Sequence, residues 1–265
     1  YFGGASLLGL HVWMLKSPPE FGFNDSIGVV KFAFVSVGAW WLIFLVPLML
    51  VVQEGKASTA GTGGTVRAAY QALAETFRQI RQYRNVYVFL IAYWLYIGGL
   101  FAVIFMAVNY GQRLGFSETD LVLALLITNF VGFPATLAYG FLGHYIGPKK
   151  AIYLGLAVYI GVAVYASLLK DVSQFYAMAI TIGLVQGGVQ GMSRSLYASL
   201  IPAEQAGEFF GFYNMLTKFA HVLGPVLIGI VGFFFVNPRF ILLAILPLFV
   251  LGAIALTRVR ITQES

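Results

Sequence analysis

Residues 86–108 read VYVFLIAYWLYIGGLFAVIFMAV and contain no charged side chain. A helix needs about 20 mostly apolar residues to cross the ~30 Å hydrocarbon core of a bilayer, so this stretch predicts a membrane-spanning helix. Comparable apolar runs cover residues 28–52, 121–142, 151–169, 175–201, 209–236 and 240–257, and a shorter run covers 2–15. Strands of a membrane barrel would instead alternate over about ten residues. The predicted fold class is therefore an all-α polytopic membrane protein.

The composition of the whole chain favours the same class. Of its 265 residues, 60% are hydrophobic and 10% are charged, whereas soluble domains carry roughly 25% charged residues. So few charges exclude a soluble enzyme and a nucleic-acid-binding protein. The net charge of +6 has another origin, because basic residues accumulate in the cytoplasmic loops of membrane proteins. The chain has no cysteine, which excludes a Cys-based metal site, and we expect no cofactor.

A polar stretch divides the chain. Residues 1–52 hold two apolar runs, residues 53–85 are polar, and residues 86–265 hold six runs. This layout predicts the end of one six-helix bundle, a cytoplasmic linker, and a second six-helix bundle. Because the first run begins at Tyr1, with neither an initiator Met nor a signal peptide, we expect the chain to be a fragment of a longer protein.

The linker itself changes character along its length. Its first part, Gly55–Thr65, is rich in Gly, Ser, Thr and Ala, which predicts a flexible segment. Leu73, Phe77 and Ile80 then recur at helical spacing with arginines on other faces. We expect an amphipathic helix at the cytoplasmic membrane surface, with connection of the two bundles as its main role.

Basic residues indicate which side of the membrane the loops occupy. Alternating spans place one group on the side of residues 53–85, namely Lys56, Arg67, Arg78, Arg81, Arg84, Lys149, Lys150, Arg258 and Arg260. The opposite side receives Lys16, Arg113, Lys170 and Arg239. Because cytoplasmic loops carry the excess of Lys and Arg, the first side is predicted to be cytoplasmic, and the C-terminus with it.

The run 175–201 contains two repeating patterns of residues. Gly183, Gly187 and Gly191 recur every four residues, a small-residue stripe that lets another helix approach closely. The side chains Gln186, Gln190 and Arg194 repeat with the same spacing on a neighbouring face. Two interpretations remain open for this polar stripe: it lines a solute-binding cavity, or its amides bond to neighbouring helices.

The run 209–236 carries a second constellation. Asn214, Lys218 and His221 share one helical face, and Lys218 would lie on the order of 10–15 Å into the membrane. Lys218 therefore either contacts the solute or bonds to a neighbouring helix, and His221 is interpreted as a packing residue rather than a proton relay. Gly224-Pro225 predicts a kink just beyond.

Other polar positions in the runs are weaker candidates for solute binding. Asn129 is a lone amide in the run 121–142. Tyr93 and Tyr96 share a face next to Gly98-Gly99, a pair predicted to interrupt that helix beside a cavity. At the cytoplasmic rim, Arg194 could pair with Glu204 or Glu208 as a latch.

Acidic residues are informative through their positions. All ten Asp and Glu residues fall in predicted loops or at helix ends, so an acid that couples transport to protons or ions is expected outside this chain. A cavity that holds Lys218, Arg194 and amide side chains would favour a solute with negative charge, such as a carboxylate.

Several motifs carry a resemblance to known transporters. Gly140-Phe-Leu-Gly-His-Tyr-Ile-Gly-Pro-Lys-Lys150 resembles the G-x-L-x-D-x-x-G-x-K loop of the major facilitator superfamily, which lies between helices 8 and 9 of that fold. The resemblance implies a gating role for Gly140, His144, Gly147 and Lys149. His144 stands where the family usually has Asp, so the usual charge latch is not carried over.

A second set of motifs is more specific. The stretches Gln186–Ser195, Ile201-Pro202, Glu208–Tyr213, Lys218 and Leu223–Pro225 resemble the branch that contains the fungal vacuolar amino-acid effluxers linked to autophagy and their bacterial relatives. The resemblance implies that residues 2–52 are helices 5 and 6 of a twelve-helix transporter. Members often carry Asp where this chain has Gly98 and Asn109, so a coupling role for those acids does not transfer.

The function expected from these features is secondary active transport. The resemblance implies alternating-access export of amino acids or similar metabolites, in a bacterial inner membrane, with the lipid bilayer, a small solute and a coupling proton or ion as partners. A transporter-fold receptor or scaffold without transport is the alternative. An intramembrane enzyme is not expected, because the three histidines lie on separate segments and no H-E-x-x-H motif exists.

Overall fold

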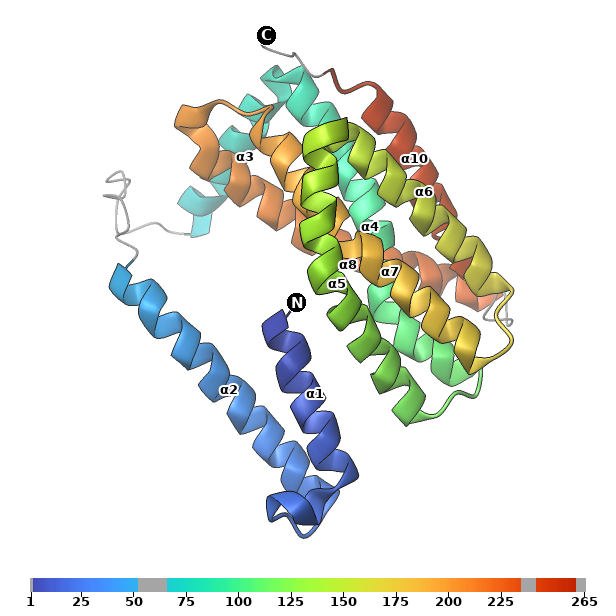
Figure 1. Ribbon diagram of the computed structural model, residues 1–265. Helices are drawn as coiled ribbons and strands as arrows, with labels where there is room; N and C mark the ends of the chain where they lie inside the picture. Colours follow the sequence, from blue (N-terminus) through green and yellow to red (C-terminus); the bar gives the residue numbers. More distant parts are fainter. Residues whose placement is uncertain (1, 52–65, 235–241, 261–265) are drawn as a thin grey trace. The chain divides into compact units, whose positions relative to one another are not determined.

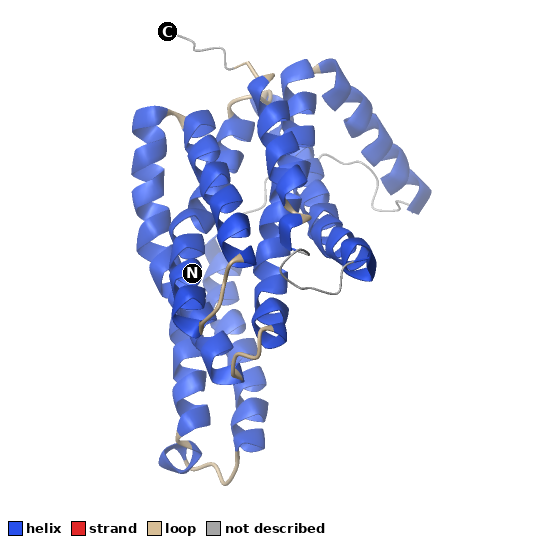
Figure 2. Ribbon diagram, turned by 90° about the vertical axis from the view of Figure 1, so that its right-hand side faces the viewer, coloured by secondary structure: helices blue, strands red, loops and turns tan. Residues whose placement is uncertain are grey.

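The structure, a computed structural model, describes residues 2–51, 66–234 and 242–260. The predicted flexible segment Gly55–Thr65 and Arg239 lie outside these ranges. The chain divides into two compact units, Tyr1–Ala69 and Tyr70–Ser265, whose helices carry their labels in Figure 1. Helices and loops are the only elements among the described residues (Figure 2), which confirms the predicted all-α class.

The N-terminal unit is a helical hairpin. It consists of α1 (Phe2–Lys16), the short 3₁₀-helix η1 (Pro18–Phe21) and α2 (Ser26–Val51). The two long helices are joined by a hydrogen bond between His11 Nε2 and Ser36 Oγ, 2.8 Å apart. Most of the apolar side chains of α2 are exposed within this unit, as expected of a helix whose surroundings are lipid or other helices.

The C-terminal unit is a helical bundle. Helix α3 (Val66–Gln82) leads into it, and its helices are α4 (Arg84–Arg113), α5 (Glu118–Ile146), α6 (Pro148–Ser167), α7 (Val172–Ala198), η2 (Ala203–Gln205), α8 (Ala206–Phe234) and α10 (Leu246–Thr257). Among the described residues, six helical segments are long and apolar enough to span a membrane: α2, α4, α5, α6, α7 and the segment 203–234, whereas α10 is shorter. These spans confirm the predicted polytopic membrane protein.

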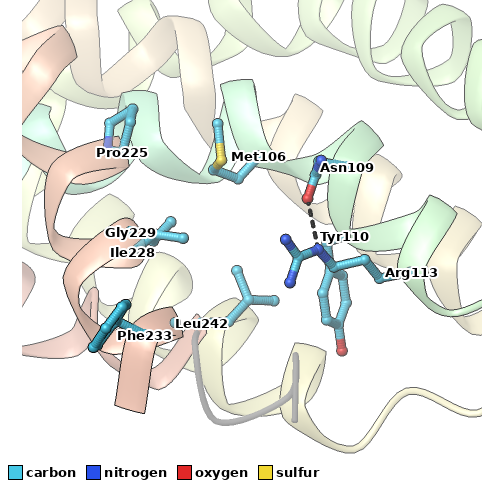
Figure 3. A pocket seen from close by; sticks show the side chains of 10 residues that line it. Met106, Asn109, Tyr110, Arg113, Pro225, Ile228, Gly229, Phe233 and Leu242 are labelled. Atoms are coloured by element: carbon cyan, nitrogen blue, oxygen red, sulfur yellow. Dashed lines mark hydrogen bonds between the residues drawn. The ribbon is translucent and has the colours of Figure 1, made fainter. Parts of the chain in front are cut away.

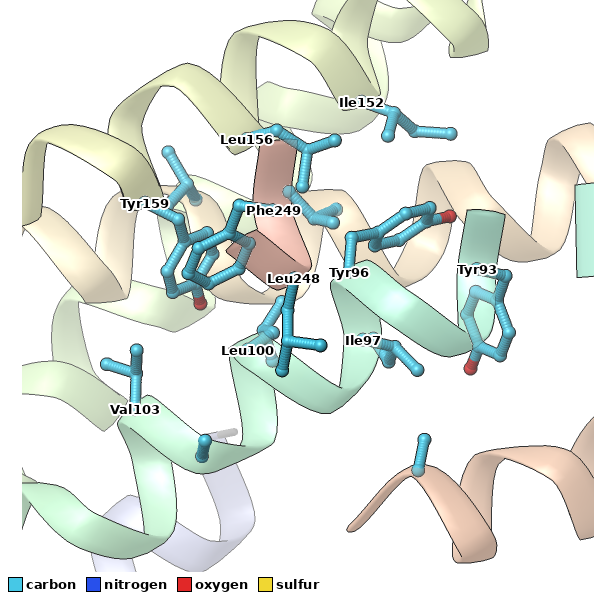
Figure 4. Packing of buried hydrophobic residues seen from close by; sticks show 14 of the residues in the cluster. Tyr93, Tyr96, Ile97, Leu100, Val103, Ile152, Leu156, Tyr159, Leu248 and Phe249 are labelled. Atoms are coloured by element: carbon cyan, nitrogen blue, oxygen red, sulfur yellow. The ribbon is translucent and has the colours of Figure 1, made fainter. Parts of the chain in front are cut away.

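Two helices organise the packing of the bundle. Helix α7 packs against α5 and α6, and helix α4 packs against α8 and α10. The interior between them is apolar and aromatic (Figure 4), with Leu100, Tyr159 and Phe249 fully buried. The rings of Tyr159 and Phe249 stack with their centroids 5.4 Å apart.

The glycine pair of α4 corrects one expectation. Gly98-Gly99 was predicted to interrupt this helix, but α4 runs unbroken from Arg84 to Arg113. A Cβ at Gly98 would lie 3.3 Å from the Ala220 carbonyl oxygen of α8, and one at Gly99 would lie 3.0 Å from the Phe249 ring of α10. The two glycines therefore serve close helix packing on both sides of α4, and their backbone stays hydrogen-bonded inside the helix.

The predicted amphipathic helix exists as α3. Ile80 is completely buried, and the Phe77 ring lies 5.9 Å from the ring of Phe212 in α8. Leu73 is exposed. One part of its apolar face thus packs against the bundle, while placement of the rest at a membrane surface stays a prediction.

Candidate functional site

Four tyrosines form a layer where α4, α7 and α8 meet. We call Tyr93, Tyr96, Tyr197 and Tyr213 the tyrosine layer; all four are at most 3% exposed. The rings of Tyr93 and Tyr213 stack at 4.3 Å, and those of Tyr197 and Tyr213 stack at 4.9 Å. Such ring pairs add to the burial of aromatic area, so the layer is a rigid junction between three helices.

The hydroxyl groups of this layer are bonded within the bundle. Tyr93 OH lies 2.8 Å from Thr217 Oγ1, and Tyr96 OH lies 2.7 Å from Ser193 Oγ. The Tyr197 hydroxyl donates to the Phe209 carbonyl oxygen at 2.9 Å. Tyr93 and Tyr96, both predicted to bind solute, are thus engaged with neighbouring helices in this conformation, where they support the surface next to them.

That surface carries the predicted polar residues of α7 and α8. We call Gln186, Gln190, Arg194, Asn214 and Lys218 the polar face. Arg194 Nη2 donates to Asn214 Oδ1 across the two helices at 3.4 Å. Lys218 follows Asn214 by one turn on α8, and Arg194, Asn214 and Lys218 are exposed while the two glutamines are partly buried. Asn214 therefore bonds to one cation, Arg194, and lies one helical turn from the other, Lys218.

The charge of the polar face is not cancelled by an acid. Glu204 in η2 and Glu208 at the start of α8 are exposed, and within the described residues Arg194 bonds to Asn214 rather than to either of them. The predicted latch is thus not formed in this conformation. Clustered cations with free donors can bind an oxyanion, so the face is suited chemically to a carboxylate.

Two other predicted residues make contacts of a different kind. Asn129 Nδ2 donates to the Leu125 carbonyl oxygen of its own helix at 2.9 Å. His221 packs between Phe101 and Phe105, with ring centroids 3.8 Å and 5.5 Å away. Its Nε2 atom is buried without a hydrogen-bond partner among the described residues. The contacts of His221 are those of a packing residue.

The loop between α5 and α6 has a defined geometry. Gly147 ends α5 and begins α6 with φ 86° and ψ 148°, a conformation reserved for glycine. Lys149 Nζ donates to the carbonyl oxygens of Val259 at 2.6 Å and Thr257 at 3.2 Å, at the end of α10. His144 is exposed, and a Cβ at Gly140 would meet no described atom within 4 Å.

The glycines of the small-residue stripe of α7 have different surroundings in the structure. A Cβ at Gly183 would lie 2.8 Å from the Thr128 carbonyl oxygen of α5, and Gly187 is buried. Gly191, however, is exposed, and a Cβ there would meet no described atom within 4 Å. The close contact falls instead on Gly188, which the Tyr139 ring of α5 covers. Among the described residues, the close contacts of this stripe region with α5 thus fall on Gly183 and Gly188.

Sequence reasoning missed four supporting residues: Ser193, Tyr197, Tyr213 and Thr217. Hydroxyl side chains in apolar helices need hydrogen-bond partners, and this requirement could have indicated that Tyr93 and Tyr96 pair with other hydroxyls. The partners are more than 90 positions away in sequence, so only the packing of helices identifies them.

A cavity of about 500 Å³ lies between α4 and α8 near the end of α4 (Figure 3). Met106, Pro225 and Phe233 supply apolar walls. Its polar side holds Arg113, whose Nε donates to Asn109 Oδ1 at 3.0 Å. This cavity is separate from the polar face, since the two share no residue.

Comparison with known proteins places these features in context. The family described as "Vacuole effluxer Atg22 like" matches residues 1–264. The chain is 34% identical over 226 residues to an uncharacterized MFS-type transporter, YxiO, of Bacillus subtilis, covering 85% of this chain and 53% of that protein.

Fungal proteins are similar as well. Autophagy-related protein 22 of Yarrowia lipolytica is 26% identical over 234 residues, with 76% of this chain and 39% of that protein covered. The protein of the same name from Cryptococcus neoformans is 24% identical over 287 residues, with 98% and 52% covered. The chain spans about half the length, or less, of these relatives.

Proposed function

Because the chain belongs to the family described as vacuole effluxer Atg22 like, we propose that the full-length protein is a secondary transporter that moves a small polar solute across the membrane. The names of its relatives, an MFS-type transporter and Atg22 proteins, support transport in general. Alternating access between two helical halves is the mechanism proposed for it. We further propose that a bacterial inner membrane is its location, with the C-terminus cytoplasmic.

The polar face carries the proposal about the solute. Arg194 and Lys218 are exposed cations in helices long enough to span the membrane, and ionisable residues in such helices are costly unless they serve a function. A carboxylate would accept hydrogen bonds from both. The proposed solute class is therefore an amino acid or a similar carboxylate-bearing metabolite, and export is the proposed direction.

The supporting layer beneath the face fits this role. A binding surface is most effective when the residues that hold it do not move. The tyrosine layer fixes α7 against α8 through stacked rings, and the Tyr93–Thr217 bond fixes α4 against α8. In the proposed transporter, these contacts would hold α7 and α8 in place while the solute binds.

The test is transport by purified full-length protein in liposomes. Labelled anionic, zwitterionic and cationic amino acids are loaded separately, and efflux is followed with and without an imposed proton gradient. Efflux of the anionic and zwitterionic solutes, with the cationic one excluded, is the expected result. If none of the three amino acids leaves the liposomes under any gradient, the substrate assignment is wrong and the scaffold alternative is favoured.

A further inference from the structure

A second cavity lies at the end of the C-terminal unit where α4 begins and α10 ends. Its volume is about 830 Å³, and no residue of the polar face lines it. The lining that matters chemically consists of Arg84 and Asn85 of α4, Ser199 after α7, and Arg258 and Arg260 after α10. Three segments that are far apart in sequence thus converge on one space.

The walls of this cavity are held in place by hydrogen bonds. The backbone N–H of Arg260 donates to Asn85 Oδ1 at 3.3 Å, which joins the end of α10 to the start of α4. Lys149 binds the carbonyl oxygens of Thr257 and Val259, on either side of Arg258. The backbone that carries two of the three arginines is therefore tied to two other helices.

The cavity has a strongly positive lining. Arg84, Arg258 and Arg260 are exposed. Among the residues that the structure describes, no carboxylate lines the space and none of the three arginines forms a side-chain ion pair. Arginine presents a planar fork of donors that matches the oxygens of a phosphate. The helix dipole of α4, whose first turn reaches this space, adds potential of the same sign.

We propose that this cavity binds a phosphate-bearing anion, either the headgroup of an anionic phospholipid or a soluble phosphate. Three guanidinium groups around one space fit a phosphate better than a single carboxylate, which one arginine can satisfy. The cavity lies where membrane helices begin and end, so we expect it at the depth of lipid headgroups, where basic pockets between helices bind anionic headgroups. Bound there, the anion would bridge α4 and α10.

The test titrates purified full-length protein in detergent with short-chain lipids and follows the midpoint of thermal unfolding. Dioctanoyl phosphatidylglycerol, dioctanoyl phosphatidylcholine and inorganic phosphate are the probes. We expect phosphatidylglycerol to bind about tenfold or more tightly than phosphatidylcholine. The triple variant Arg84→Gln/Arg258→Gln/Arg260→Gln should lose this preference, while Arg78→Gln/Arg81→Gln/Lys150→Gln, which removes equal charge outside the cavity, should keep it.

The source of the anion follows from the same titrations. Arginine-dependent stabilisation by inorganic phosphate alone would assign a soluble phosphate, whereas stabilisation by phosphatidylglycerol alone would assign the lipid. The variant Arg84→Lys/Arg258→Lys/Arg260→Lys keeps the positive charge but lacks the planar guanidinium donors, so it should bind the anion with intermediate affinity. This variant separates a loss of binding from a folding defect. A phosphatidylglycerol preference that survives in the Gln triple, or is lost equally in the control triple, would overturn the proposal.

Discussion

At the scale of single residues, two lysines of the bundle show how surroundings determine a role. Lys149 and Lys218 are both cations within or at the start of apolar helices. Lys149 is bound to two backbone carbonyls of α10, whereas Lys218 is exposed beside Asn214 on the polar face. The first lysine contacts the end of another helix, whereas the second is the one that we propose to contact the solute.

Replacement of Lys218 by Met should therefore impair transport. Loss of one hydrogen bond from a charged group costs about 1.5–3 kcal/mol, which corresponds to a rise in KM for an anionic amino acid of about tenfold or more. The measurement is efflux from liposomes as a function of internal solute. Lys170→Met, at an exposed loop lysine, is the control, and an unchanged KM for Lys218→Met would remove this lysine from the site.

The buried bond between Tyr96 and Ser193 should contribute modestly to stability. Because Ser193 Oγ donates to the Val189 carbonyl oxygen, it accepts from the Tyr96 hydroxyl. Hydrogen bonds between membrane helices average about 0.6 kcal/mol and reach about 1.7 kcal/mol. A double-mutant cycle of Tyr96→Phe and Ser193→Ala, measured by unfolding in mixed micelles, should give a coupling in that range. Tyr165→Phe, at a position 39% exposed, should leave stability unchanged; zero coupling in the cycle would contradict the bond.

At the scale of elements, glycines decide how closely the helices approach. Gly98 and Gly224 face each other where α4 crosses α8: a Cβ at Gly224 would lie 2.8 Å from the Gly98 carbonyl oxygen. The glycine pair Gly98-Gly99 suggested a broken helix, since glycine weakens isolated helices. Because glycine has no side chain, these two unbroken helices instead pack backbone to backbone.

Substitution of Gly224 by Ala should destabilise the bundle. The added methyl group would collide with Ala102 and the Gly98 carbonyl, and overpacking of this kind costs about 1–3 kcal/mol. Gly229→Ala on the same helix is the matched control, because a Cβ there meets no described atom within 4 Å. Thermal unfolding of both variants is the measurement. Equal stability of the two proteins would contradict the close crossing.

Lys149 should protect the end of α10 from local opening. Lys149→Gln removes an ammonium that binds two carbonyl oxygens, and a hydrogen bond from a charged group is worth about 1.5–3 kcal/mol. Hydrogen exchange in residues 255–260 should therefore accelerate about fivefold or more. The adjacent Lys150, which is exposed, supplies the control Lys150→Gln. Unaltered exchange at the end of α10 would show that the contact does not stabilise it.

At the scale of the whole molecule, the sidedness of the membrane spans can be tested directly. Lys150 lies in the first turn of the membrane span α6 and Lys170 follows its end, and both side chains are exposed. The chain contains no cysteine, so single cysteines introduced at these positions report their own accessibility. With an impermeant maleimide, Lys150→Cys should react from the cytoplasmic side and Lys170→Cys from the opposite side. Labelling of both from one side would refute the predicted topology.

Sequence periodicity predicted the helices well and their contacts poorly. The apolar runs matched the spans because a bilayer requires a fixed length of apolar helix. For the predicted Gly183–Gly187–Gly191 stripe, small residues indicate that a helix packs closely but do not specify the azimuth of its neighbour. Helix α5 contacts Gly183 and Gly188, whereas the packing role of Gly191 stays a prediction. The same reason explains why Tyr93 and Tyr96 were noted without Thr217 and Ser193.

By itself the sequence determined the membrane class, the number and order of the apolar runs and the resemblance to a transporter family, because each depends on local composition or on contiguous motifs. Only the tertiary structure showed that hydroxyl groups of the tyrosine layer bond to neighbouring helices, and that Arg194 bonds to Asn214. It also showed that Arg84, Arg258 and Arg260 line one cavity. Each of these contacts joins residues of different helices. The way helices cross in space brings these residues together, and local sequence periodicity does not encode that crossing.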